Sequence, residues 1–93
     1  MPAPDSTLED VRASVLRYLR MYEEGQFTLG DLAAELAVMA QPYEHAMGAL
    51  DDHYRELLAV ARREREIMKL NPFAGLDVLE EAVTRFRRSE AEW

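Results

Sequence analysis

The sequence predicts an all-α protein, either a compact four-helix bundle or an orthogonal array of four helices. Apolar residues recur at intervals of three and four in four segments, and no segment alternates between apolar and polar residues as a strand does. Glycine or proline separates these segments, and the short joints permit either arrangement. We expect the helices near residues 6–24, 28–40, 42–70 and 72–91.

The length of the chain predicts one domain. Its 93 residues can bury a single modest core. We expect residues 1–5, which include two prolines, to form a flexible N-terminal tail and residues 6–93 to form a single helical domain. No apolar run approaches the roughly 20 residues of a membrane-spanning helix, and the first residues do not resemble a secretory signal. Because the chain has no cysteine, we expect a cytoplasmic protein without disulfides.

The first two helices have recognisable boundaries. Ser6 and Glu9 fit a capping box at the start of the first helix, and Gly25 suits the left-handed conformation that follows a helix end. Thr28 is expected to cap the second helix. Apolar residues cover nearly every side of that helix, which predicts that it lies at the centre of the fold or is covered by a partner.

The boundaries of the last two helices are marked by proline. Because proline favours the first turn of a helix, we expect one long helix over 42–70 and another that starts at Pro72, with Asn71 as its cap. The predicted core stripe of the long helix is Tyr43, Met47, Leu50, Tyr54, Leu57, Ala61 and Met68. A neighbouring stripe is Ala46, His53, Val60 and Ile67. The predicted core face of the last helix is Phe73, Leu76, Leu79, Val83 and Phe86.

Charge is distributed unevenly along the chain. Eighteen Asp and Glu residues oppose eleven Lys and Arg residues, for a net charge of −7. Residues 1–52 hold ten of the acidic residues and only three of the basic ones. Between Met21 and Tyr54 there is no Lys or Arg at all. Such a segment repels phosphate and attracts a basic partner.

Few residues point to catalysis. The glycines are scattered and form no phosphate-binding loop, and the chain has no thiol nucleophile. His45 and His53 do not share a face of the predicted helix, and neither follows an acidic residue at the spacing of a di-metal site. His45, Asp52 and Glu56 share a stripe, which we interpret as a solvated polar face rather than half of a metal site. We therefore predict a non-enzymatic protein with no catalytic residues, metal or cofactor.

Two other functions remain as alternatives. Residues 28–37 resemble the opening of a helix-turn-helix DNA-binding motif whose recognition helix would begin at Pro42. That helix would begin without Lys or Arg, on which DNA affinity depends, so nucleic acid is not the expected partner. The other alternative is a homo-oligomeric structural or adaptor protein joined through the second helix and Trp93. The basic residues of the second half alternate with glutamates, and we interpret them as a surface ion-pair network that includes Glu81 and Arg85.

The stretch YEEGQFTLGDL, from Tyr22 to Leu32, resembles the first inter-helix joint of small, acidic, all-helical immunity proteins and antitoxins of bacteria. Proteins of that kind neutralise a toxin, often a basic nuclease, by covering it. The resemblance implies an acidic protein-interaction module that inhibits a basic protein partner. The acids it implies as partner-facing are Glu23, Glu24, Asp31, Glu35, Glu44, Asp51 and Asp52. The alternative is that these acids only keep the protein soluble.

Overall fold

The protein is all-α, as the sequence predicts. The computed structural model describes residues 4–71 and 73–92 and contains no strand in these ranges. Its helices are α1 (Pro4–Glu23), α2 (Leu29–Ala40), the 3-10 helix η1 (Gln41–Ala49), α3 (Asp52–Leu70) and α4 (Leu76–Glu92).

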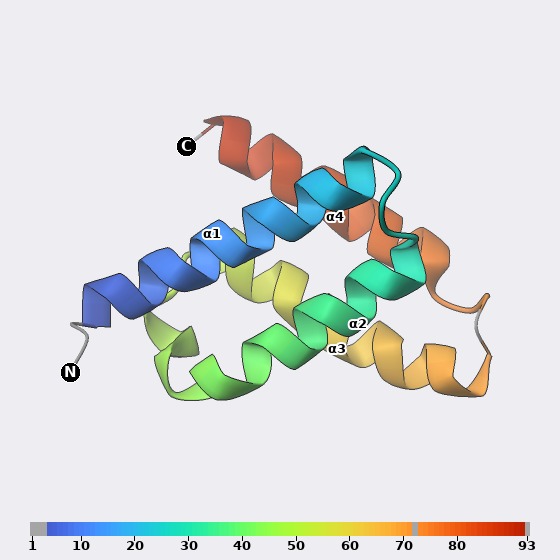
Figure 1. Ribbon diagram of the computed structural model, residues 1–93, viewed down its shortest axis with the longest axis horizontal. Coiled ribbons are helices and arrows are strands. Elements are labelled where there is room, and N and C mark those ends of the chain that lie inside the picture. Colours follow the sequence, from blue (N-terminus) through green and yellow to red (C-terminus); the bar gives the residue numbers. More distant parts are fainter. Residues whose placement is uncertain (1–3, 72, 93) are drawn as a thin grey trace.

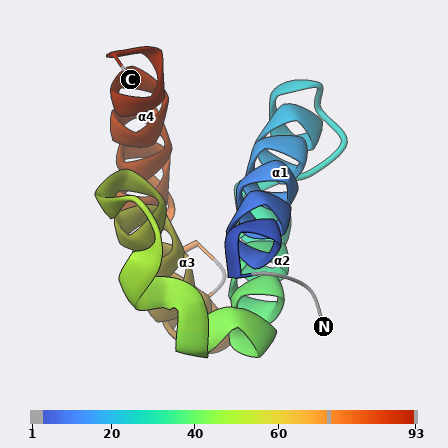
Figure 2. The same ribbon diagram turned by 90° about the vertical axis from the view of Figure 1, so that its left-hand side faces the viewer.

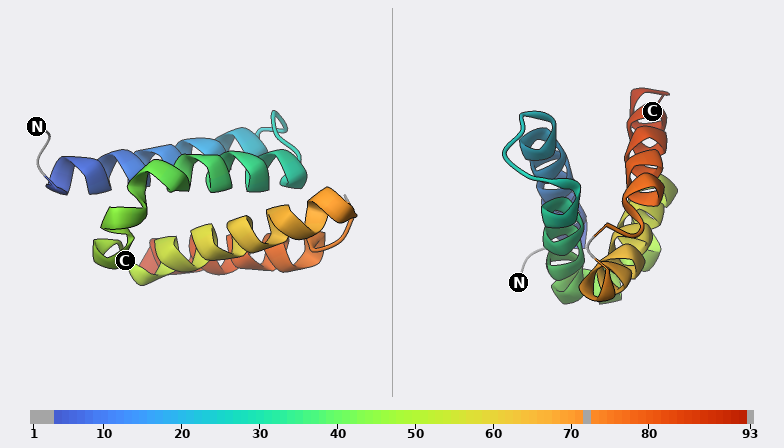
Figure 3. Two further views of the ribbon diagram at one scale, coloured as in Figure 1. Left: turned by 90° about the horizontal axis from the view of Figure 1, so that it is seen from below. Right: turned by 90° about the vertical axis from the view of Figure 1, so that its right-hand side faces the viewer.

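The four α-helices form two hairpins that pack side by side. Figures 1 and 2 show α1 lying along α2, α4 lying along α3, and η1 joining the two hairpins at one end. The α2 helix packs most extensively on α3 and also contacts α1, α4 and η1. This central position confirms what its apolar composition predicts. Successive α-helices run in opposite directions, so the α1–α2 and α3–α4 turns share the end opposite to η1 (Figure 3).

The boundary between α1 and α2 follows the sequence signals closely. Gly25 has a φ of +81°, and the N–H of Gln26 donates to the carbonyl of Met21 at 2.8 Å, as in a glycine-terminated helix end. The hydroxyl of Thr28 accepts from the N–H of Asp31 at 3.1 Å. The Asp31 carboxylate accepts in return from the N–H of Thr28 at 3.2 Å. The predicted cap of the second helix is therefore confirmed and is a reciprocal capping box.

The α1 helix begins two residues before the predicted start. Pro4 occupies its first position, where the missing N–H of proline is not needed. Ser6 consequently lies within the helix rather than at its cap, and Pro4 and Asp5 are helical although they were assigned to the tail. The rest of that predicted tail, positions 1–3, lies outside the described residues.

The prediction of a single long helix over residues 42–70 is wrong. Residues 41–49 form the 3-10 helix η1, and α3 begins only at Asp52. Between them Asp51 has an extended ψ of 146°, which ends one helix before the next starts. Two tertiary contacts accompany this break, because Leu50 is 3% exposed in the core and the Asp51 carboxylate lies 3.3 Å from Nε of Arg12.

The predicted start of the last helix is also wrong. Asn71 does not cap a helix there, because its side-chain oxygen accepts from the N–H of Phe73 at 3.1 Å in a local turn. Gly75, with a φ of +79°, continues this turn, and α4 starts at Leu76. Phe73 therefore lies outside the helix, whereas Pro72 lies outside the described residues.

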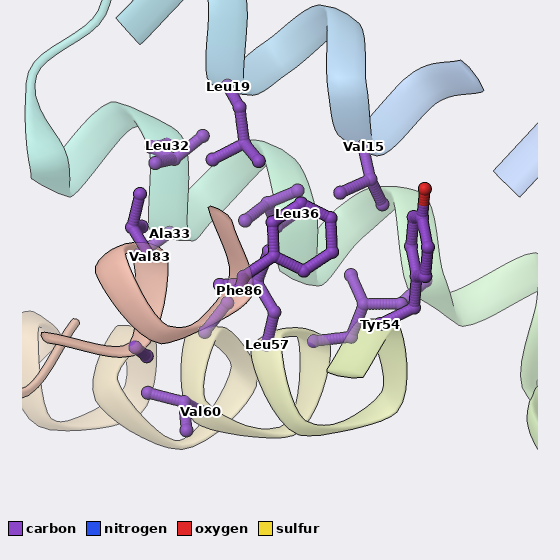
Figure 4. Close-up of a cluster of buried hydrophobic side chains, with 14 of the residues drawn as sticks. Val15, Leu19, Leu32, Ala33, Leu36, Tyr54, Leu57, Val60, Val83 and Phe86 are labelled. Atoms are coloured by element: carbon purple, nitrogen blue, oxygen red, sulfur yellow. The ribbon is translucent and has the colours of Figure 1, made fainter. Parts of the chain in front are cut away.

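The core fills the space between the two hairpins. Tyr54 and Phe86 meet edge to face, with ring centroids 4.9 Å apart, and Figure 4 shows Phe86 among side chains from α1, α2 and α3. Burial of these side chains is the main force that stabilises the fold. The largest fully buried residues are Tyr54, Phe86, Leu19, Leu32, Leu36, Leu57, Leu58, Leu79, Val11 and Val15. Ile67, which the sequence places in a buried stripe, is instead 41% exposed.

One charged side chain belongs to the interior rather than to a surface ion-pair network. Glu64 of α3 is 4% exposed and accepts from Nε of Arg63 at 3.3 Å. Its carboxylate lies against the backbone of Gly75, where a Cβ atom would overlap Oε2 of Glu64. The α3–α4 turn can approach Glu64 this closely because residue 75 has no side chain. The predicted ion pair of Glu81 with Arg85 is present on the surface at 3.2 Å.

Candidate functional site

The seven acids predicted to face a partner do not form one surface. One group lies around the α1–α2 turn and contains Glu23, Glu24 and Asp31. A second group lies at the opposite end, on η1 and at the start of α3, and contains Glu44, Asp51 and Asp52. Glu35 lies between them on the exposed side of α2. The length of α2 therefore separates the two acidic groups.

Four of these acids are paired with arginines from other parts of the sequence or from the same helix. The pairs are Glu23 with Arg87, Glu44 with Arg62, Asp51 with Arg12 and Asp52 with Arg55. The segment between Met21 and Tyr54 contains no Lys or Arg, but in the folded protein arginines from outside it lie beside four of its acids. Within the described part of the chain, Glu24 and Glu35 form no ion pair, and Asp31 serves in the α2 capping box.

A cluster of polar side chains lies where α1, the start of α3 and the end of α4 meet. Nε2 of His53 lies 2.6 Å from Oε2 of Glu90, and the Tyr54 hydroxyl donates to Oε1 of Glu90 at 3.1 Å. The Arg12–Asp51 pair borders the same place, and a cavity of about 400 Å³ is lined by Arg12, Asp51, Tyr54 and Glu90. Sequence reasoning missed this cluster, because its members are up to 78 positions apart.

The chemistry of this cluster supports a structural role. Burial, together with the negative charge of Glu90 and its hydrogen bond, raises the pKa of the Tyr54 phenol to about 12. The phenol therefore stays protonated at neutral pH and can donate to the Glu90 carboxylate. The polar groups of the cluster hydrogen-bond or pair with one another. We read the cluster as a clasp that joins the end of α4 to the start of α3.

The described residues contain no group of three or more His, Cys, Asp and Glu side chains placed to share a metal ion. Asp52 and Glu56, which share a predicted stripe with His45, are exposed and pair with Arg55 and Arg85. That arrangement fits a solvated polar face. His45 itself lies in η1, and its side chain is outside what the structure describes.

Two large apolar side chains project from the α3–α4 turn. Leu70, the last residue of α3, is 91% exposed, and Phe73 is 82% exposed. Neither exposure follows from the sequence pattern, which predicts a buried helical face for Phe73 and marks Leu70 in no way. The signal that could have found them is the spacing of Asn71 and Gly75, both of which are typical of turns. Exposed apolar side chains that gather in one place are a common mark of interaction sites.

The two alternative functions meet specific obstacles. The segment that would be a DNA-recognition helix is a 3-10 helix, Gln41–Ala49, and its sequence has no Lys or Arg. Trp93, named for self-association, lies outside the described residues. No helix in the described part of the chain is long and apolar enough to cross a membrane. Comparison with family models, with curated proteins and with solved structures found no match for this chain.

Proposed function

We propose that this protein is a non-enzymatic protein-interaction module that binds a basic protein partner, in the manner of an inhibitor or immunity protein. The proposal rests on one observation, the exposure of Leu70 and Phe73 beside the α3–α4 turn. Apolar anchors of this kind supply much of the energy of protein association.

The acidic residues near these anchors favour a basic partner. The α1–α2 turn lies at the same end of the molecule as the α3–α4 turn (Figures 1 and 3). We call this end the turn face and define it by Glu24, Asp31, Leu70 and Phe73. Its two acids are exposed, and the chain as a whole carries a net charge of −7. Exposed acidic groups near apolar anchors can steer a basic partner toward them.

The second acidic group contributes less to this proposal. Glu44, Asp51 and Asp52 are held by arginines of the same chain, so a basic partner would have to compete with those pairs. Reversing their charge would also place a lysine beside an arginine and disturb the fold. For this reason the electrostatic test uses Glu24 and Glu35, which form no ion pair within the described residues.

The experiment is affinity capture from the native host, with nuclease present, using four versions of the tagged protein. The wild type is compared with Leu70→Ser/Phe73→Ser, with Glu24→Lys/Glu35→Lys, and with the control Glu9→Lys/Asp10→Lys at the far end of α1. We expect one basic protein to be captured by the wild type and by the control. The Leu70→Ser/Phe73→Ser variant should lose it, and the Glu24→Lys/Glu35→Lys variant should bind it more slowly, with a weaker dependence on salt.

The result that contradicts the proposal is equally definite. If all four versions capture the same proteins to the same extent, the turn face is not a binding surface. The acids would then serve solubility alone. Circular dichroism of each variant ensures that a loss of capture is not a loss of folding, and both apolar substitutions are at exposed positions where folding is expected to tolerate them.

A further inference from the structure

A groove runs along the contact between α2 and α3, and one end of it adjoins the turn face. One cavity of about 340 Å³ is lined by Ala37, Gln41, Arg62, Arg63, Arg65 and Glu66. A second cavity, of about 310 Å³, is lined by Gly30, Ala34, Arg65, Met68 and Lys69. Because Arg65 lines both, the two cavities adjoin and form one α2–α3 groove.

The α3 side of this groove is basic. Four of its lining side chains are Lys or Arg, and one is acidic, in a protein whose net charge is −7. The positive groups are therefore concentrated here against the overall charge. Such a local concentration attracts a negatively charged ligand.

Two of the basic side chains of the groove, Arg62 and Lys69, can exchange their present partners. Arg62 and Lys69 are paired with Glu44 and Glu66, but every side chain in these pairs is between 45% and 67% exposed. Exposed pairs of this kind contribute little to stability, so a carboxylate of another molecule can replace the acid in each pair. Arg65, in the middle of the groove, forms no ion pair within the described ranges of the chain.

The α2 side of the groove is lined by small, mostly apolar residues. Gly30, Ala34 and Ala37 follow one another at helical spacing and line the cavities. Val38, one turn after Ala34 on the same outward side, is 50% exposed. Small residues let a second backbone come close, as in grooves that hold amphipathic helices. This surface also accounts for the apolar residues of α2 that the core does not bury.

We infer that the α2–α3 groove binds an acidic amphipathic segment of a partner protein, with its carboxylates on Arg65 and its neighbours and its small apolar side chains against α2. This inference goes beyond the proposed function, because it concerns other residues and a partner of opposite charge. The groove meets the turn face at one end, where Gly30 and Lys69 adjoin Asp31 and Leu70. Nucleic acid is the other class of anionic ligand that a basic surface can attract, so a DNA duplex is included in the test.

The test uses two labelled peptides and the full-length protein. One is a short amphipathic helix of Glu, Ala and Leu, and the other has Lys in place of every Glu. Binding is followed by fluorescence anisotropy, and the site is mapped by amide chemical shifts. We expect only the acidic peptide to bind and the shifts to follow α2 and α3. Arg65→Glu should weaken binding about tenfold or more.

Matched variants separate the charge from the shape of the groove. Arg88→Glu makes the same charge change on α4 and should leave binding within about twofold of the wild type. Ala34→Gln fills the floor and should weaken binding, whereas Ala59→Gln, at an exposed position of α3, should not. Circular dichroism shows whether each variant is folded. Arg65→Glu and Ala34→Gln test the groove separately, so one of them still gives a result if the other is unstable.

Four results would overturn the inference. The peptides could bind equally, or Arg65→Glu could have no larger effect than Arg88→Glu. A DNA duplex could bind more tightly than the acidic peptide and be lost in Arg65→Glu, which would make the groove a nucleic-acid site. Light scattering could show self-association that Arg65→Glu abolishes, which would make the occupant a second copy of the chain.

Discussion

Nε2 of His53, near the start of α3, lies 2.6 Å from Oε2 of Glu90, near the end of α4. The other carboxylate oxygen of Glu90 accepts from the hydroxyl of Tyr54 at 3.1 Å. One carboxylate therefore connects the final turns of α4 to the first turn of α3, beside the edge-to-face contact of Tyr54 with Phe86. The side chain of Glu90 is only 29% exposed, which strengthens these hydrogen bonds relative to surface ones.

Replacing Glu90 with alanine should destabilise the fold. The substitution removes the acceptor of two partly buried donors, so we expect the free energy of unfolding to fall by about 1–3 kcal/mol. Urea unfolding followed by circular dichroism measures this change. Glu80→Ala, at an exposed position of the same helix, is the control and should change it by less than about 0.5 kcal/mol. Equal midpoints for the two variants would show that the clasp contributes nothing to stability.

Tyr54 should make stability depend on pH in the alkaline range. Burial and Glu90 raise its pKa from 10.0 to about 12, so the folded state favours the protonated phenol. The stabilisation is complete below pH 10 and is lost as pH rises through 12, because the unfolded chain then releases the proton more readily than the folded one. Two pKa units correspond to at most about 3 kcal/mol.

The measurement for Tyr54 is a comparison with Tyr54→Phe. Urea midpoints of the wild type should fall between pH 9 and pH 11 by more than those of the variant. The difference between the two proteins isolates Tyr54 from the other three tyrosines, which are present in both. Absorbance of the phenolate should also lose its highest-pH component in the variant. If both proteins respond to pH in the same way, the phenol is not shielded as the structure indicates.

Much of the helical framework could be predicted because its signals are local. Gly25 and Thr28 determine a helix end and a helix start through bonds to residues within five positions, so sequence alone locates them. The break before α3 is different. It coincides with the burial of Leu50 and with the pairing of Asp51 with Arg12, and neither contact can be inferred from neighbouring residues.

The candidate sites were harder to predict for the same reason. A run of acids without Lys or Arg suggests a strongly negative surface, but Arg62 and Arg87 pair with Glu44 and Glu23 from 18 and 64 positions away. Periodicity similarly assigns Phe73 to the core, whereas a turn closed by Asn71 leaves it exposed. Which charged and apolar residues lie together on the surface is decided by how the helices pack, and the pattern along the chain does not contain this information.

Gly75 should be intolerant of any side chain. Its φ of +79° disfavours other residues, and a Cβ atom would overlap the buried carboxylate of Glu64. We expect Gly75→Ala to lower the free energy of unfolding by about 1–3 kcal/mol. Gly48→Ala is the matched control, because no atom lies within 4 Å of its Cβ position and its φ is not positive. This second change should be neutral or stabilise by up to about 1 kcal/mol.

A double substitution separates the two causes at Gly75. In Glu64→Ala/Gly75→Ala the overlap is absent and only the backbone strain remains. The double variant should therefore be destabilised by less than the sum of the effects of Glu64→Ala and Gly75→Ala alone. Simple additivity would mean that Glu64 does not restrict residue 75, and an unchanged midpoint for Gly75→Ala alone would contradict both causes. Thermal unfolding of the four proteins in one buffer gives all the required values.

Thr28 offers the most local test of how the sequence determines the fold. Its hydroxyl accepts from the N–H of Asp31 at 3.1 Å. Thr28→Ala leaves this N–H, in the first turn of α2, without that acceptor. The free energy of unfolding should therefore fall by about 1 kcal/mol. Thr84→Ala is the control, because the hydroxyl of Thr84 bonds the Glu80 carbonyl within α4, where alanine is the better helix former. Urea unfolding should show a lower midpoint for the first variant and an equal or higher one for the second. If the two variants moved in the same direction by the same amount, the effect would come from losing a hydroxyl in general, and the capping box could not be the reason that α2 begins where it does.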